Sequence, residues 1–305
     1  MSLPPGARDV RPVGGGDINE AFRAVLHDGT DAFVKTRADA APGEYAAEAA
    51  GLRWLAEPGA LRTPRVLDAD DGYLALQWIE HGRLDADGEQ ELGRGLAATH
   101  TAHAPRFGRF TEGSGGERDG DGGGTGGGGG DVGGNGDGDD DEGAAGFGSL
   151  RLSNAPTTEW PTFYAERRLR PLARLARDGD VLSPAGVRTI ERVCERMAQL
   201  TGAPEAPARL HGDLWQGNLL ADSHGRPWLI DPSAYGGHRE VDLAMLALFG
   251  SPSPIVLASY REVAPLADGW QERVGLYQLL PLLVHALLFG GSYRVAAEDM
   301  ARRYA

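Results

Sequence analysis

The chain has 305 residues, of which 41% are hydrophobic and 24% are charged, a composition typical of a globular protein. It contains no apolar run long enough to predict a membrane span, and its first ten residues, MSLPPGARDV, lack the features of a signal peptide. A net charge of −14 without any basic stripe argues against a nucleic-acid partner. The single cysteine, Cys194, excludes an internal disulfide and predicts a reducing compartment, the cytoplasm.

Two regions of the chain differ in pattern. Residues 1–80 have the pattern of strands with one helix, whereas residues 81–305 are mostly helical in pattern. The segment 113–143 interrupts the second region and contains 17 of the 46 glycines. Residues 112–143 hold ten acidic residues and one arginine, so they carry −9 of the total charge. Because this segment has almost no apolar side chains to bury, we predict a disordered surface insertion there.

The first candidate binding element is the glycine-rich stretch VGGGDINEAFRAV. Gly14, Gly15 and Gly16 lie between two strand-like stretches, and glycine allows backbone N–H groups to approach a phosphate closely. The stretch lacks the spaced G-x-G-x-x-G pattern, and three glycines also suit the tip of any hairpin. Its position about 20 residues before a distinctive lysine favours the phosphate-binding interpretation.

That lysine, Lys35, is the only one in the chain, and the other 29 basic residues are arginine. It lies in DAFVKT (31–36), which is predicted to be a short strand. Lysine binds phosphate as a compact point charge that arginine does not reproduce, so Lys35 is a candidate phosphate ligand. The alternative is an ordinary solvated lysine on a strand.

A helix is predicted in PGEYAAEAAGLRWLAEPG (42–59), because proline suits its first turn and Pro-Gly ends it. Its apolar face consists of residues at spacings of three, four and three, namely Tyr45, Glu48, Leu52 and Leu55. A carboxylate on that face is costly unless it is paired, and Lys35 on the preceding strand is the natural partner of Glu48. The alternative is a frayed helix whose Glu48 reaches solvent.

The stretch HGDLWQGN contains Asp213 and Asn218, five residues apart. Two short strands are predicted after it, at 219–221 and 228–230, around a Ser-His-Gly-Arg-Pro turn. Their antiparallel pairing would bring Asn218 beside Asp231, and an amide oxygen with a carboxylate suits Mg²⁺ whose other ligands are phosphates. Asp213 is then placed to accept a proton from an attacking hydroxyl, so the pattern predicts a phosphoryl-transfer centre.

The order of a glycine loop, Lys35, Glu48, H-G-D-x-x-x-x-N and Asp231 resembles that of the protein-kinase-like small-molecule kinases, which include aminoglycoside and choline kinases. HGDLWQGN, DPSAYGGHREVDLAMLALFG and the C-terminal LYQLLPLLVHALLFGGSYRVAAEDMARRY are similar to the fructosamine kinase family, also called ketosamine-3-kinases. The resemblance implies an α+β, two-lobed protein-kinase-like fold. A small, mostly β N-terminal lobe (1–80) would bind ATP, and a larger, mostly α C-terminal lobe (81–305) would hold the catalytic and acceptor sites.

The same resemblance implies ATP and Mg²⁺ as cofactors and assigns roles to individual residues. Lys35 would hold the α- and β-phosphates of ATP, braced by Glu48. Asp213 would be the catalytic base, and Asn218 and Asp231 would hold Mg²⁺. The remaining ATP-binding residues would be Gly14, Gly15, Gly16, Asp17, Ile18 and Asn19 over the phosphates, and Gln77, Trp78 and Ile79 at the adenine hinge.

The implied acceptor is O3 of a ketosamine, a fructosamine or ribulosamine adduct on a small amine or a protein, whose 3-phosphate is unstable and releases the amine. Trp215 either packs the loop or lines the sugar pocket, and His238 is mainly structural, with a substrate contact as its second interpretation. Two other functions stay open: a kinase for another small alcohol, such as choline or an aminoglycoside, and a catalytically silent binding module. The sequence indicates no oligomeric state.

Overall fold

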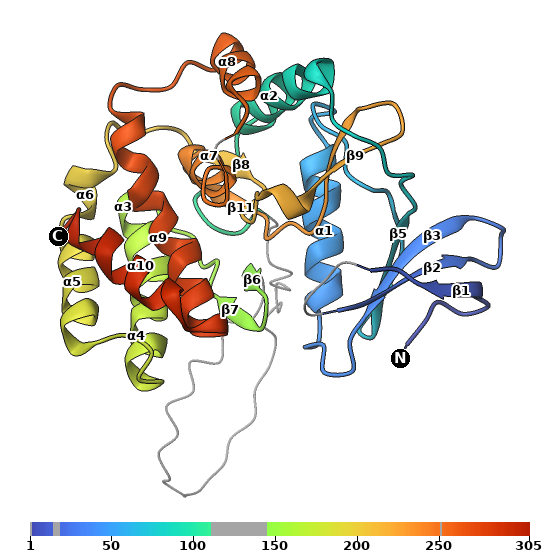
Figure 1. Cartoon of the computed structure of the whole chain (residues 1–305), viewed down its shortest axis with the longest axis horizontal. Helices are drawn as coiled ribbons and strands as arrows, with labels where there is room; N and C mark the ends of the chain where they lie inside the picture. Colours follow the sequence, from blue (N-terminus) through green and yellow to red (C-terminus); the bar gives the residue numbers. More distant parts are fainter. Residues whose placement is uncertain (1, 15–18, 111–144, 251) are drawn as a thin grey trace, which may run out of the picture.

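The protein has a β-sheet region and a helical region that lie side by side, with helix α1 (Glu44–Ala56) between them (Figure 1). The computed structural model describes residues 2–14, 19–110, 145–250 and 252–305. The sheet region precedes the helical region in the chain, as the sequence pattern predicted.

Antiparallel strands form the N-terminal sheet, in the order β1-β2-β3-β5-β4. The strands are β1 (Arg8–Pro12), β2 (Glu20–Val25), β3 (Asp31–Thr36), β4 (Val66–Asp70) and β5 (Tyr73–Gln77). Successive side chains of a strand point to opposite faces, so Lys35 shares with Phe33 the face of β3 on which α1 packs. The predicted strand at 31–36 is confirmed, and it presents the lysine toward the helix.

The apolar face predicted for helix α1 is the face that packs on the sheet. Tyr45 and Leu52 are buried against Leu74 and Leu76 of β5. Glu48 lies between them on the same stripe, as the periodicity predicted. The sheet and α1 together therefore bring a carboxylate and an ammonium group to one buried surface.

The helical region consists of helices and three short two-stranded antiparallel sheets, two of which are hairpins. The helices are α2 (Ala86–Thr101), α3 (Trp160–Tyr164), a π-helix (Ala165–Leu169), α4 (Arg170–Asp178), α5 (Pro184–Glu195), α6 (Met197–Leu200), α7 (Glu240–Leu246), α8 (Pro254–Val263), α9 (Trp270–Phe289) and α10 (Ser292–Arg302). The two hairpins pair β6 (Ala145–Phe147) with β7 (Leu150–Leu152) and β9 (Leu219–Ala221) with β10 (Pro227–Leu229). The third sheet pairs β8 (Ala208–Leu210) with β11 (Tyr235–Gly237), which lies after the β9–β10 hairpin in the chain.

Helix α9 is the central element of the helical region. Its buried side chains, among them Leu276, Leu279 and Leu283, belong to the largest apolar cluster, to which α4, α5, α7 and α10 also contribute. By length and composition α9 could cross a membrane, which the sequence analysis did not predict, and 61% of its apolar window is buried inside the protein. Such burial is typical of the core helix of a packed domain.

This architecture confirms the predicted combination of a mostly β N-terminal part with one key helix and a mostly α C-terminal part. The predicted lobe boundary after residue 80 falls between the end of β5 and the start of α2, and it stays a prediction. The predicted insertion at 113–143 lies outside the described residues.

Candidate active site

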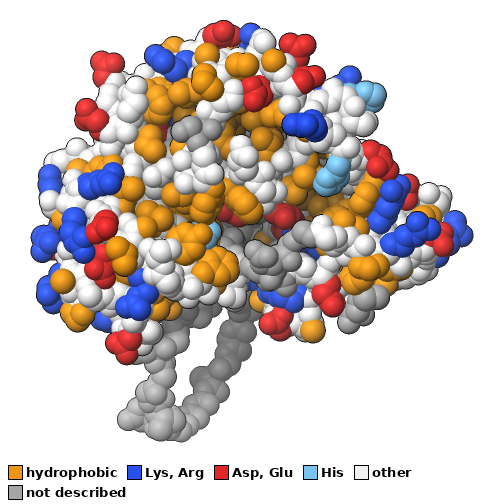
Figure 2. Space-filling model, viewed as in Figure 1, with side chains coloured by type: hydrophobic (Ala, Val, Ile, Leu, Met, Phe, Trp, Pro, Cys, Tyr) orange, Lys and Arg blue, Asp and Glu red, His pale blue; other side chains and the backbone are white. Residues whose placement is uncertain are grey.

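A cleft of about 880 Å³ is lined by residues of both the sheet region and the helical region. Figure 2 shows this face hollowed near its middle, with hydrophobic side chains around the hollow and acidic side chains inside it. The cleft brings together most of the site residues predicted from the sequence: Gly14, Asn19, Lys35, Glu48, Gln77, Trp78, Ile79, Asp213, Trp215, Asn218 and Asp231.

Three charged residues, Lys35, Glu48 and Asp231, form what we call the lysine cluster. Lys35 Nζ lies 2.5 Å from Glu48 Oε2 and 2.9 Å from Asp231 Oδ1, and only 6% of the lysine side chain is exposed. Burial lowers the pKa of Lys35, but the two carboxylates raise it by more, so the amine stays protonated. The predicted Lys35–Glu48 pair is present, and the contact with Asp231 is an addition to it.

The two carboxylates of the lysine cluster differ in character. Burial raises the pKa of Glu48 to about 7, because the attraction of Lys35 offsets it only in part. Glu48 Oε1 is buried and has no hydrogen-bond partner within the described part of the chain. Burial also opposes ionisation of the partly exposed Asp231, but Lys35 outweighs it and lowers the pKa of Asp231. The cluster therefore holds an incompletely neutralised carboxylate next to the cleft.

Asp213 and Asn218 lie together in the loop that follows β8. Asn218 Nδ2 donates to the Asp213 carbonyl oxygen at 2.8 Å, to Asp213 Oδ2 at 3.0 Å and to the Asp231 carbonyl oxygen at 3.4 Å. Burial raises the pKa of Asp213 to about 7, although the hydrogen bond from Asn218 lowers it. A carboxylate with a pKa near neutrality is suited to accept a proton.

The hairpin after this loop differs by one residue from the prediction. Leu219 pairs with Leu229, so the second strand is 227–229 and not 228–230. The Leu229 N–H donates to the carbonyl oxygen of Arg62, a contact from outside the hairpin that no local pattern shows. Ile230 is consequently the residue opposite Asn218. Asn218 still reaches the backbone of the following residue, Asp231, so the expected convergence is preserved.

The side-chain oxygens of Asn218 and Asp231 suit a magnesium ion that is bound together with phosphates. Because Asn218 uses its Nδ2 on carbonyl and carboxylate oxygens, its Oδ1 is left for a cation, and the carboxylate of Asp231 lines the same cleft. Within residues 2–14, 19–110, 145–250 and 252–305 no group of three or more His, Cys, Asp or Glu could hold a metal by itself. Mg²⁺ commonly takes one or two protein oxygens and completes its shell with phosphates and water. The residues present fit that mode.

The backbone of the loop is fixed by Asp242, which is fully buried. Its carboxylate accepts from the His211 N–H at 2.7 Å and the Gly212 N–H at 2.9 Å, and His100 Nε2 lies 3.2 Å away. The His211 ring bonds through Nε2 to the Ile230 carbonyl oxygen at 2.8 Å. These contacts tie the loop with the predicted base to α2, α7 and the hairpin strand, so its geometry is set before any ligand binds.

The predicted adenine hinge follows β5 along the edge of the cleft. The Gln77 N–H donates to Arg65 and the Trp78 N–H to Asp31, whereas no described residue accepts from the Ile79 N–H. Of the three predicted hinge residues, Ile79 therefore keeps a backbone donor for a base.

At the glycine loop, Gly14 and Asn19 line the cleft, and Tyr45 donates to Asn19 Oδ1 at 3.1 Å. The predicted phosphate contacts of Gly15, Gly16, Asp17 and Ile18 lie outside the described residues.

Comparison with known proteins identifies the scaffold that carries this site. The sequence model of one family, described as fructosamine kinase, matches residues 5–117 and 144–305. The chain belongs to the fructosamine kinase family. The match omits residues 118–143, which is most of the acidic insertion. The resemblance drawn from the sequence motifs is thus confirmed, and this kinase is an ATP-dependent phosphotransferase by family.

Three relatives illustrate the similarity. The chain is 33% identical to the "Probable ketoamine kinase" of Lactiplantibacillus plantarum, over 97% of this chain and 94% of the relative. It is 32% identical to the chloroplastic "Protein-ribulosamine 3-kinase" of Arabidopsis thaliana, over 96% and 81% of the two chains. A crystal structure of a candidate fructosamine-3-kinase from Thermobifida fusca superposes with a TM-score of 0.81 at 39% identity, covering 98% and 93%. The predicted protein-kinase-like fold is confirmed.

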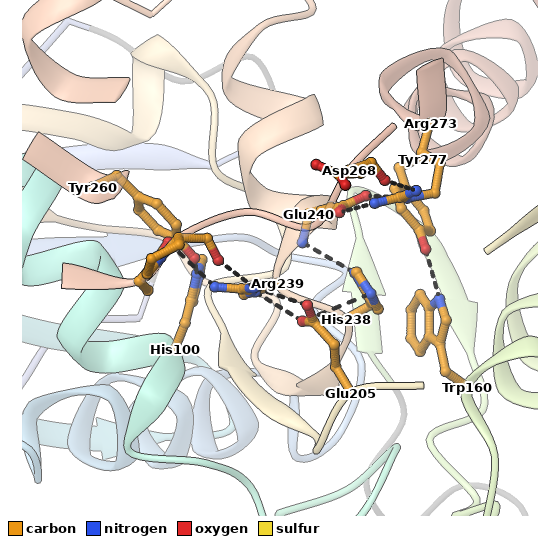
Figure 3. Close-up of polar contacts among 12 residues, drawn as sticks. His100, Trp160, Glu205, His238, Arg239, Glu240, Tyr260, Asp268, Arg273 and Tyr277 are labelled. Carbon is orange, nitrogen blue, oxygen red and sulfur yellow. Dashed lines mark hydrogen bonds and ion pairs between the residues drawn. The ribbon is translucent and has the colours of Figure 1, made fainter. Parts of the chain in front are cut away.

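The kinase does not place His238 in its cleft. The side chain is 3% exposed, stacks on Tyr277 with ring centroids 5.4 Å apart, and lies with Nε2 3.8 Å from Glu205 (Figure 3). Burial lowers the pKa of His238 to about 4, so its ring is neutral. The substrate contact considered for His238 is therefore not supported, because the ring lies behind the wall that Tyr277 presents to the cleft. Trp215, in contrast, is exposed and lines the cleft.

Two ion pairs, which we call the arginine pairs, surround His238 in Figure 3. Arg239 donates to both oxygens of Glu205 at 2.8 Å. Arg273 donates to both oxygens of Glu240 at 2.8 and 2.7 Å, and both residues are buried. The arginine pairs join the start of α7 to the segment before β8 and to the first turns of α9. They are structural contacts that hold the helices beneath the cleft.

The sequence analysis missed Asn154, a nearly buried residue that lines the cleft. Arg168 is fully buried and donates through Nη2 to Asn154 Oδ1. Its guanidinium lies over the rings of Phe163 and Tyr235, at 4.5 and 4.2 Å from their centroids. Because a guanidinium only donates, Asn154 must turn its Oδ1 toward Arg168, and its Nδ2 remains as a donor for a ligand in the cleft.

A signal for this pair existed in the sequence. Arg168 lies three residues after Ala165 and four before Leu172, on an apolar stripe of the same kind as that of Glu48. A charged side chain on such a stripe is costly unless it has a partner. The π-helix at Ala165–Leu169 then changes the helical register, so the partner could not be identified from spacing alone.

Proposed function

We propose that the protein transfers the γ-phosphoryl group of ATP to O3 of the sugar in a ketosamine, a fructosamine or ribulosamine adduct on an amine. Relatives named ketoamine kinase and ribulosamine 3-kinase support this acceptor class. The observation that carries the proposal is the half-buried carboxylate of Asp213, fixed by Asn218 in the same cleft as the lysine cluster. The 3-phosphate formed would be unstable and would release the amine, which reverses glycation.

Each residue of the site has a stated role in this reaction. Asp213 accepts the proton of the attacking hydroxyl, and Lys35 binds the α- and β-phosphates while Glu48 orients its amine. Asn218 and Asp231 would hold Mg²⁺, which when bound neutralises charge on the phosphates. Lys35 also contacts Asp231, so the proposed phosphate ligand lies directly beside the proposed magnesium site.

The nucleotide has a defined place in this proposal. Gly14 and Asn19 border the phosphates. Gln77, Trp78 and Ile79 border the adenine, and the N–H of Ile79, from which no described residue accepts, is its backbone donor. This arrangement leaves the opposite, α9 side of the cleft for the acceptor.

A kinase for a polycationic alcohol fits the cleft less well. The carboxylates that line it among the described residues are Glu44, Glu48, Asp213 and Asp231. Glu44 is paired with Arg37 and Arg151, and Lys35 lies on two others. Among these carboxylates only that of the base has no Lys or Arg partner, which favours an acceptor with fewer ammonium groups than an aminoglycoside. The intact set of charged residues likewise argues against a silent binding module.

The test is ADP release with Mg²⁺–ATP for ribulosyl-lysine, fructosyl-lysine, choline and an aminoglycoside, followed by phosphorus NMR of the product. We expect turnover of a ketosamine with the phosphate on O3. Asp213→Asn is the matched control, because it should bind ATP and release no ADP. Turnover of choline or the aminoglycoside alone would contradict the acceptor, and silence on all four acceptors would contradict the enzymatic proposal itself.

A further inference from the structure

A continuous row of aromatic rings lies along the helical side of the cleft. The row, which we call the aromatic row, consists of Trp215, Phe249, His285, Phe289 and Tyr293, and all five line the cleft. Ring centroids are 6.0 Å apart for Trp215–Phe249, 5.3 Å for Phe249–His285, 5.5 Å for His285–Phe289 and 4.9 Å for His285–Tyr293. The rings therefore form one surface that three segments of the chain share.

The aromatic row begins beside the proposed base and leads away from it. Trp215 lies two residues after Asp213, and its N–H donates to the Asp213 carbonyl oxygen at 3.2 Å. From there the row passes to α9 and to the start of α10. A molecule whose hydroxyl meets Asp213 would lay its remaining part along these rings.

The rings are exposed although they are large and apolar. Trp215 is 38% exposed, Phe249 45% and Phe289 57%. Single exposed hydrophobic residues are ordinary, but a contiguous exposed apolar surface in a cleft is typical of a binding site. The exposed faces in the aromatic row thus indicate a ligand that covers them.

The charge of the cleft wall that α9 and α10 form restricts the chemistry of a ligand that covers the aromatic row. The lining residues from α9 and α10 include no Asp, Glu, Lys or Arg, and the Nδ1 of His285 already bonds to the Pro281 carbonyl oxygen, so these residues offer a carboxylate or a guanidinium no oppositely charged Asp, Glu, Lys or Arg. Aromatic faces do attract a cation close to them, and the secondary amine of a ketosamine is protonated at neutral pH. The wall therefore suits an ammonium group that is followed by an uncharged, apolar or aromatic substituent.

We propose that the aromatic row is the subsite for the amine part of the acceptor, and that it selects ketosamines whose nitrogen carries an aromatic or apolar substituent. This inference rests on the proposed function, since it names which ketosamines the same site prefers. Glycated small aromatic amines would be better acceptors than glycated amino acids, whose carboxylate meets no Lys or Arg among the lining residues of α9 and α10.

The test compares acceptors that share one sugar and differ in the amine: the ribulosyl adducts of benzylamine, of Nα-acetyl-lysine and of glycine. We expect kcat/KM to be highest for the benzylamine adduct and about tenfold lower for the glycine adduct. Phe249→Ala and Phe289→Ala should each raise the KM of the benzylamine adduct severalfold and leave the KM of ATP and of the glycine adduct unchanged. Val295→Ala is the matched control, because Val295 on α10 is 61% exposed and does not line the cleft.

Several results would overturn the inference. Equal kcat/KM for the three adducts would do so, as would phenylalanine variants that change all acceptors alike. Phe249→Leu and Phe289→Leu keep an apolar side chain and guard against a folding effect of the alanine variants. If the alanine variants changed the oligomeric state in light scattering and not the acceptor preference, the row would be a contact between copies of the chain, which also overturns it. Failure of the proposed function is distinct, because then no ketosamine turns over.

Discussion

Two groups of buried charges in this kinase differ in how completely they are paired. In the arginine pairs each guanidinium meets one carboxylate through two hydrogen bonds. In the lysine cluster one ammonium group serves two carboxylates, and one oxygen of Glu48 has no partner among the described residues. Both groups lie close to the cleft or beneath it, yet only the lysine cluster opens into it.

The difference in pairing separates structural charges from functional ones. A buried charge without a full set of partners is costly to fold, so it persists where a ligand completes it. The raised pKa of Glu48 reflects this cost directly. The arginine pairs need no ligand, and their bidentate geometry identifies them as connections between elements. Substitutions in the two groups should consequently change different quantities.

The largest effect is expected at Asp213, the base beside the lysine cluster. Asp213→Asn should lower kcat by about 10²–10⁴-fold and leave ATP affinity unchanged, because the proton acceptor is lost and the shape is kept. The melting temperature should stay the same or rise, since the variant removes a half-buried carboxylate whose pKa is already raised to about 7. Initial rates, an ATP titration and a thermal melt measure the three quantities. A loss of ATP affinity as large as the loss of kcat would contradict the assignment of Asp213 as base.

The opposite pattern is expected at the arginine pairs. Arg273→Met leaves the carboxylate of Glu240 buried and unpaired, which should cost about 3–5 kcal/mol of the free energy of unfolding. The kcat of the folded fraction should be unchanged. The double variant Arg273→Met/Glu240→Leu is the matched control and should recover much of the loss, because no lone charge remains. Urea unfolding measures the stability. If Arg273→Met unfolds at the same urea concentration as the parent, the ion pair does not contribute to stability.

A smaller effect is expected from pH at His238. Its pKa is about 4 in the folded protein and near 6.5 when unfolded, so the unfolded chain binds the proton first as pH falls. The contribution of His238 to the free energy of unfolding is therefore fully present above pH 6.5 and is lost toward pH 4. The loss amounts to about 1 kcal/mol between pH 7.5 and 5.5. Arg239 lowers the pKa of Glu205 against the effect of burial, and this pair weakens at lower pH in the same direction.

The variant His238→Phe isolates the histidine contribution, since it keeps a ring against Tyr277 and removes the titrating group. Urea unfolding at the two pH values should show a weaker pH dependence than in the parent. If parent and variant lose the same stability between pH 7.5 and 5.5, the buried imidazole is not responsible.

The smallest effect is expected at Asn154. Asn154→Asp keeps an oxygen for Arg168 and removes the Nδ2 donor of a residue that lines the cleft. The KM of the ketosamine should rise about tenfold, the range expected for one lost hydrogen bond and an unpaired acceptor, with the KM of ATP unchanged. Steady-state kinetics with each substrate varied in turn give both values. An equal rise in the two KM values would place Asn154 outside the acceptor site.

Much of the site could be predicted because its determinants are local in the sequence. Helical periodicity put Glu48 on an apolar face, and the need to pair it pointed to Lys35. The loop with Asp213 and Asn218 is followed at once by a hairpin, so short-range strand pairing sufficed to place Asp231 nearby.

The rest depends on contacts between distant segments. The ion pair of Lys35 with Asp231 joins residues 196 positions apart, and it forms only when the two regions of the protein are packed together. Arg168 reaches Asn154 through a π-helical turn that spacing rules for α-helices do not describe. The sequence favoured a structural role for His238 but left a substrate contact open, because the packing of Tyr277 and Trp160 around its ring is a property of the tertiary structure.

The burial of Lys35, the only lysine of the chain, affects how readily reducing sugars can modify this protein. A sugar carbonyl condenses with an amine that is unprotonated and accessible, and Lys35 is neither, because its pKa is raised and two carboxylates cover its Nζ. The protein thus presents no reactive lysine to reducing sugars, and its N-terminal amine is the primary amine that they could modify. After prolonged incubation with ribose, peptide mass spectrometry should find Lys35 without a sugar adduct, and an adduct there would refute this protection. A proposed repair enzyme for glycated amines is in this way kept from becoming its own substrate.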